Sequence, residues 1–99
     1  MNSLPSIASS GMAAAQTRLQ SSASNIANLS TNNYRRQEVN QTAQSGGGVS
    51  ATVSRAATAG AALEADVVDQ LQAKNSFLAN LAVFKTSNQL QGALLNEKA

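Results

Sequence analysis

The chain has 99 residues, of which 42% are apolar and 12% charged, and its formal net charge is +2. It contains no histidine and no cysteine, which excludes a histidine-based catalytic triad, a thiol nucleophile, a disulfide framework and a cysteine- or histidine-ligated zinc site. A chain of 99 residues is expected to form a single domain, over residues 1–99. Because 19 of its residues are alanine, we expect its hydrophobic core to be small.

The first predicted element is a helix over residues 3–29. Ser3 can cap its start, and Pro5 is tolerated in the first turn because its missing N–H has no intrahelical partner there. Apolar residues recur along it at the heptad spacing that is typical of a helix packed lengthwise on another helix. The residues assigned to this seam are Met12, Ala15, Leu19 and Ile26.

A polar connection over residues 30–62 follows the first helix. Its start is predicted to be a turn and capping motif made of Asn25, Asn28, Thr31, Asn33 and Tyr34. Asn33 can adopt the left-handed conformation that a helix C-cap needs. Three glycines at 46–48 can turn between two short extended stretches. A bare two-stranded hairpin is barely stable in water, so we expect this connection to be a weak hairpin or disordered.

The second predicted helix covers residues 63–96 and carries several apolar stripes. Val67, Leu71 and Leu78 are assigned to the seam with the first helix. The remaining apolar surface exceeds what one antiparallel neighbour covers, so a second group is assigned to assembly with other subunits: Phe77, Leu81, Phe84, Leu90 and Leu94. The expected fold class is all-α, with two long antiparallel helices in a coiled-coil-like hairpin.

Three patterns suggest a chemical site, but each has a simpler explanation or lacks a required residue. Glu64, Asp66 and Asp69 could suggest a metal site, but negative charge in the first turns of a helix is explained by the helix dipole. Residues 34–36, a tyrosine before two arginines, offer too few aromatic and basic groups for nucleic-acid binding. The glycines at 46–48 lack the lysine and hydroxyl residue of a phosphate loop. We therefore expect no catalytic, cofactor or metal site, no nucleic acid and no small-molecule substrate.

Both ends of the chain resemble one protein family. The segments SIASSGMAAAQTRL at 6–19, ASNIAN at 23–28 and YRRQ at 34–37 resemble the amino terminus of the bacterial flagellar axial proteins, and residues 64–96 look like their carboxyl terminus. A short proximal rod subunit is the most similar type. Asn33 stands where this family usually has glycine, and the segment between the two ends is shorter than in the family's rod proteins.

This resemblance implies a structural role. It implies a subunit of the flagellar basal-body rod that polymerises through its terminal helices for motility. The implied partners are copies of the chain itself, other axial proteins and the flagellar type III export machinery, and the implied location is the periplasm-spanning basal body, reached without a cleaved signal peptide. The alternative is a small flagellum-associated adaptor that binds axial proteins or export machinery without forming the tube.

Overall fold

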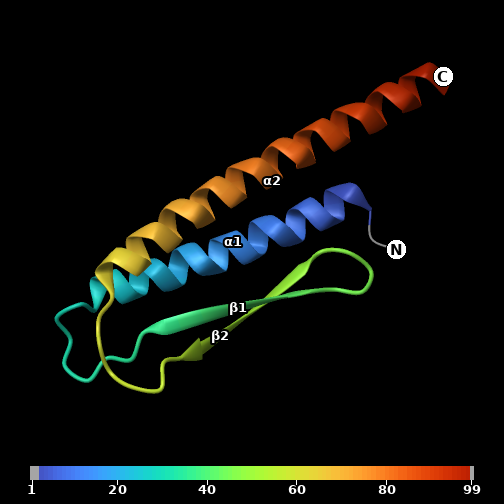
Figure 1. Ribbon diagram of the computed structural model, residues 1–99. Helices are drawn as coiled ribbons and strands as arrows, with labels where there is room; N and C mark the ends of the chain where they lie inside the picture. The colour runs from blue at the N-terminus through green and yellow to red at the C-terminus, as the bar shows by residue number, and fades with distance from the viewer. Residues whose placement is uncertain (1–2, 99) are drawn as a thin grey trace.

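The computed structural model describes residues 3–98, which form a helix, two strands and a second helix (Figure 1). The helix α1 spans Leu4–Ala27, the strands β1 and β2 span Gln37–Ala43 and Val49–Arg55, and the helix α2 spans Leu63–Lys98. Residues 1, 2 and 99 of the predicted domain lie outside the described residues.

The three parts of the fold form layers with α1 in the middle. The helix α2 runs antiparallel along one side of α1, the β-hairpin lies along the other side, and α2 continues past the end of α1 (Figure 1). The molecule is flat and elongated, with principal extents of 63 × 24 × 14 Å. It exposes 6578 Å², whereas a compact chain of 10.1 kDa would expose roughly 5,300 Å². The exposed area is larger than that of a compact chain because the molecule is elongated and its core is small.

The ends of α1 are fixed by short polar side chains. Ser3 is the N-cap, and its hydroxyl accepts a hydrogen bond from Ser6 N–H at 3.3 Å. At the other end the helix stops at Ala27, and Asn28 is the C-cap. The side-chain amide of Asn28 donates to the carbonyl oxygen of Ser24 at 2.8 Å, which satisfies one of the carbonyls that a helix end leaves without a partner.

The all-α fold class predicted from the sequence is wrong, because the connection contains a two-stranded antiparallel sheet. Seven residues of each strand pair, from Gln37 opposite Arg55 to Ala43 opposite Val49. Gly47 and Gly48 make the turn with φ of 95° and 92°, a conformation that costs glycine little. The hairpin is stable here because it is not bare: it packs along α1, and its tip at Gly47 lies against Ile7.

The helix pair is held by small and polar residues. The buried residues of α1 are Ala8, Ala14, Ala15, Ser21, Ser22 and Asn25, and those of α2 are Asp66, Ala73 and Ser87. Gly11 lies so close to α2 that a Cβ added there would be 2.6 Å from Asn80 Oδ1. The absence of a side chain at Gly11 leaves room for the Asn80 amide against α1, and a larger side chain there would push this amide away.

This interface differs from the seam predicted for α2. Val67, Leu71 and Leu78 are 41%, 57% and 50% exposed. The face turned to α1 instead carries Asp66, Ala73, Asn80 and Ser87, at seven-residue spacing. On α1, Ala15 is fully buried and Met12, Leu19 and Ile26 are half-buried. The apolar stripe of α1 thus contributes to the interface, while the three aliphatic residues assigned to it on α2 point outward.

Within residues 3–98, neither helix is long and apolar enough to cross a membrane.

Candidate functional site

A cluster of polar side chains joins α1, the hairpin and α2 at one end of the molecule. At its centre is Asn25, which is buried near the end of α1. Its Nδ2 donates to the carbonyl oxygen of Gln37 at 3.0 Å and to Asp66 Oδ1 at 3.1 Å. Its Oδ1 accepts from Gln37 N–H at 2.7 Å and from the hydroxyl of Tyr34 at 3.3 Å. One amide of α1 therefore bonds to both of the other layers, the hairpin and α2. We call Asn25, Tyr34, Arg36, Gln37 and Asp66 the polar junction.

The ion pair of the polar junction is formed by Arg36 and Asp66. Asp66 lies in the first turns of α2 and is 1% exposed. Arg36 Nε donates to Asp66 Oδ2 at 3.3 Å, and Arg36 Nη2 donates to Asp66 Oδ1. The hydrogen bond that Arg36 donates to Asp66 is the main cause that raises the pKa of Arg36 above its usual value. A buried carboxylate is costly unless it is paired and hydrogen-bonded, and here both conditions are met.

The predicted turn and capping residues lie next to this junction. Thr31 Oγ1 donates to Asn28 Oδ1 at 3.1 Å, so these two close the turn after α1. Asn33 has φ of 62° and sits within the turn rather than at the helix end. The hydroxyl of Tyr34 lies 3.0 Å from Ser24 Oγ, and the guanidinium of Arg55 covers the Tyr34 ring at 5.2 Å from its centroid. The structure thus brings all five residues of the predicted motif together.

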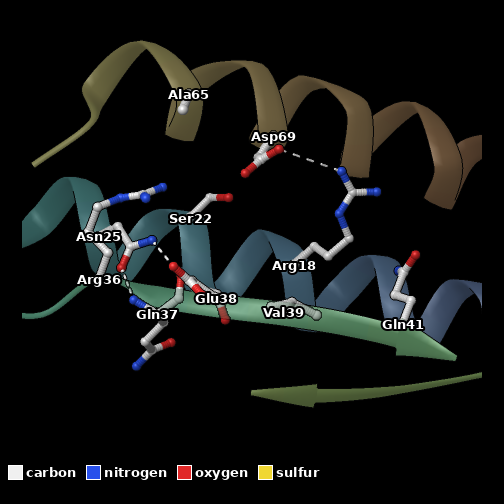
Figure 2. Close-up of a pocket in the computed structure, with 11 residues that line it drawn as sticks. Arg18, Ser22, Asn25, Arg36, Gln37, Glu38, Val39, Gln41, Ala65 and Asp69 are labelled. Carbon is white, nitrogen blue, oxygen red and sulfur yellow. Dashed lines mark hydrogen bonds and ion pairs between the residues drawn. The ribbon is translucent and has the colours of Figure 1, made fainter. Parts of the chain in front are cut away.

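A polar groove of about 540 Å³ runs beside the junction (Figure 2). Its sides are β1 and the start of α2, and α1 forms its floor. Val39 and Gln41 of β1 line one side, and Ala65 and Asp69 of α2 line the other. Arg18 reaches across from α1, with its Nη2 at 3.9 Å from Asp69 Oδ1. The groove is therefore lined by positively and negatively charged side chains and runs along the strand β1.

The residues assigned to assembly fall into two groups. Phe77, Leu81 and Phe84 are half-buried on the part of α2 that flanks its contact with α1. Leu90 and Leu94 are both 60% exposed. Leu94 follows Ser87 by seven residues, so it continues the face of α2 that packs on α1. The antiparallel register set by Asn25 with Asp66 and Gly11 with Asn80 places the start of α1 opposite Ser87. Leu90 and Leu94 therefore lie past the end of α1.

Asp66, Asp69 and Arg35, which belong to the acidic and the basic pattern of the sequence, contact other residues of the chain. Asp66 is paired with Arg36, and Asp69 lies by Arg18. Within residues 3–98, no group of three histidine, cysteine or acidic residues could hold a metal ion. Arg35 Nε donates to the carbonyl oxygen of Ala56, which fastens the base of the hairpin.

Sequence reasoning missed the partnership of Arg36, Gln37 and Asp66 with Asn25. It also missed the contact of Gly11 with Asn80. The available signal was the seven-residue spacing of Asp66, Ala73, Asn80 and Ser87, which an analysis that follows only large apolar residues does not register.

These features define a paired-helix protein with a docked β-hairpin, whose polar groups hold its own elements together. Among known families, the model described as "Flagella basal body rod protein" matches residues 6–35, which include all of α1 but its first two residues. This segment is similar to the flagellar basal body rod family, and the resemblance predicted for the amino-terminal part of the chain is confirmed over these residues. The family is structural and non-enzymatic, and its members are components of the flagellar basal body. No curated protein matches the chain.

Proposed function

We propose that this chain is a structural subunit of the flagellar basal-body rod that polymerises through exposed surfaces of its helices. The observation that carries the proposal is the extension of α2 beyond α1. α2 has 36 residues and α1 has 24, and in the uncovered part the face that packs on α1 continues with Leu90 and Leu94.

The uncovered part of α2 is suited to binding another subunit because the residue type changes along this face. Where α1 covers it, the face carries Ala73, Asn80 and Ser87, whereas Leu94 takes the next heptad position. Burying a leucine side chain that is otherwise exposed to water contributes about 1.5–3 kcal/mol. A helix of another subunit laid along this extension would gain that contribution at each leucine.

The outward stripe of α2 supports the same proposal. Val67, Leu71 and Leu78 lie away from α1 and are all more than 40% exposed. One helix pair with apolar residues on two sides can contact several neighbours at once, as a subunit within a tube must. Subunits of this kind would be exported through the flagellar type III machinery, contact other axial proteins in the periplasm-spanning basal body and support motility.

Sedimentation velocity over a range of concentrations tests the proposal. The wild-type chain should associate without a fixed end point, and the double variant Leu90→Ala/Leu94→Ala should associate much less while circular dichroism shows retained helix. The matched control is Leu63→Ala, an exposed leucine at the start of the same helix. A single defined oligomer at all concentrations would contradict polymerisation and favour the adaptor, which binds axial proteins or export machinery without forming the tube.

A further inference from the structure

The register of the β-hairpin shows which backbone groups point outward at its two edges. Ala56 N–H donates to the carbonyl of Arg36 at 2.8 Å, and Gln44 N–H donates to the carbonyl of Gly48 at 3.0 Å. In an antiparallel pair, hydrogen-bonded residues alternate along each strand. The even-numbered residues therefore direct their backbone groups to the partner strand, and the odd-numbered residues direct theirs outward. The outward groups belong to Gln37, Val39, Gln41 and Ala43 on β1 and to Val49, Ala51, Val53 and Arg55 on β2.

On each edge of the hairpin, one side chain of α1 bonds to the outward backbone groups at one end. The amide of Asn25 both donates to and accepts from the backbone of Gln37, as a residue of a third strand would (Figure 2). At the opposite end of the hairpin, Ser10 Oγ accepts from Val49 N–H at 3.0 Å. The helix α1 thus crosses the hairpin diagonally, from the edge of β2 near the turn to the edge of β1 near its start.

What remains is one unoccupied stretch on each edge, 39–43 on β1 and 51–55 on β2. Within residues 3–98, the outward backbone groups of these stretches have no hydrogen-bond partner outside the hairpin in the structure. The two stretches have the same length and lie on opposite edges of one sheet. Unpaired edges of this kind are templates for pairing with another strand.

We infer that the β1 edge at 39–43 binds the β2 edge at 51–55 of a second copy of this chain, so that the hairpins of successive copies form a continuous antiparallel sheet. This inference rests on the proposed function, and it names the partner and the contact. In the pairing, Gln41 of one copy lies opposite Val53 of the next, and Asn25 and Ser10 set the limits of the register. The incoming strand enters the groove along Val39 and Gln41.

Each added copy contributes two strands to this sheet, which repeat every 9–10 Å or so. The contact joins two different surfaces, and such head-to-tail contacts generate rings or open-ended filaments.

Disulfide trapping tests this contact, since the chain has no cysteine of its own. Two variants are prepared separately, Gln41→Cys and Val53→Cys, and are mixed under oxidising conditions at concentrations where sedimentation shows association. Residues opposite each other in a sheet have Cα atoms about 4.5–5.5 Å apart, within the range that a disulfide spans. We expect the mixed disulfide to exceed the two symmetric ones several-fold by mass spectrometry. The control mixture replaces Val53→Cys with Thr52→Cys, whose side chain lies on the other face of the sheet, and should give little mixed product.

A second measurement does not depend on cross-linking. Ala51→Pro removes an outward N–H while the ladder within the hairpin keeps its donors, and it should lower association with little change in circular dichroism. Ala59→Pro, in the coil before α2, is the matched control and should associate as the wild type does. If the chain associates yet forms no mixed disulfide, or forms mainly a symmetric one, the edge contact is overturned while the rod subunit stands. If it does not associate at any concentration, both proposals fail.

Discussion

Arg36 binds both carboxylate oxygens of Asp66, so that the residue before β1 and the first turns of α2 are joined across the end of α1. Asp66 also accepts from Asn25 Nδ2. The carboxylate therefore bonds both to the other helix and to the base of the hairpin within the polar junction. Its removal leaves a buried amide and a partly buried cation without their common partner.

Asp66→Ala should be strongly destabilising. Removing one partner of a buried ion pair costs about 3–5 kcal/mol, and urea unfolding followed by circular dichroism measures the loss. Asp69→Ala is the matched control, because Asp69 lies 3.9 Å from Arg18 and is half exposed. An exposed pair of this kind contributes about 0–1 kcal/mol. Equal losses in the two variants would show that the polar junction does not hold the layers together.

The ion pair also predicts a pH dependence. Because Asp66 raises the pKa of Arg36, Arg36 stabilises the folded chain at every pH below its unfolded pKa, and this contribution is lost only as pH rises through the higher folded value. In Arg36→Lys the group has an ordinary pKa of about 10.4. We expect the difference in urea midpoint between wild type and Arg36→Lys to grow as pH rises above about 10, because the lysine loses its proton there while the arginine keeps its own. A constant difference across this range would contradict the pairing, since the chains share every other titratable group.

Gly11 and Asn80 should be energetically coupled. Alanine in place of glycine within a helix gains about 1 kcal/mol of intrinsic propensity, but a Cβ at residue 11 would collide with the Asn80 amide. Gly11→Ala should therefore gain less than this in the wild-type chain and the full amount in the Asn80→Ala background. A double-mutant cycle by urea unfolding measures the coupling, for which we expect about 0.5–3 kcal/mol. Identical effects of Gly11→Ala in both backgrounds would remove the evidence for this close approach.

Ser87→Ala should stabilise the chain. Within residues 3–98, the Ser87 hydroxyl is a buried side-chain oxygen without a hydrogen-bond partner. An unsatisfied buried polar group costs about 1–3 kcal/mol, and alanine is also the better helix former. The midpoint of urea unfolding should rise. Ser76→Ala, a half-buried serine of the same helix, controls for propensity alone; a gain no larger than in that variant would mean that the Ser87 hydroxyl is not costly.

Local patterns in the sequence were sufficient to predict the two helices and the turn that follows the first one. Ser3 and Pro5 marked the start of α1, the polar run after Ala27 marked its end, and the long apolar periodicity of residues 63–96 marked α2. These are local signals, set by capping, backbone conformation and periodicity, and each can be read from neighbouring residues alone. The family resemblance was equally local, since the matching segment coincides with α1 and the turn that follows.

The fold class and the packing faces of the helices depend on contacts between distant segments, which local patterns do not show. The hairpin was expected to be weak because two strands alone cannot bury enough surface, yet α1 supplies a packing partner and, through Asn25 and Ser10, hydrogen bonds to both edges. The seam of α2 was assigned to Val67, Leu71 and Leu78 because they are large and apolar. The close approach at Gly11 instead selects alanine, serine and asparagine. Periodicity finds the stripe of greatest hydrophobicity, whereas this helix pair packs through small and polar side chains, and the leucines of α2 at 71 and 78 face outward.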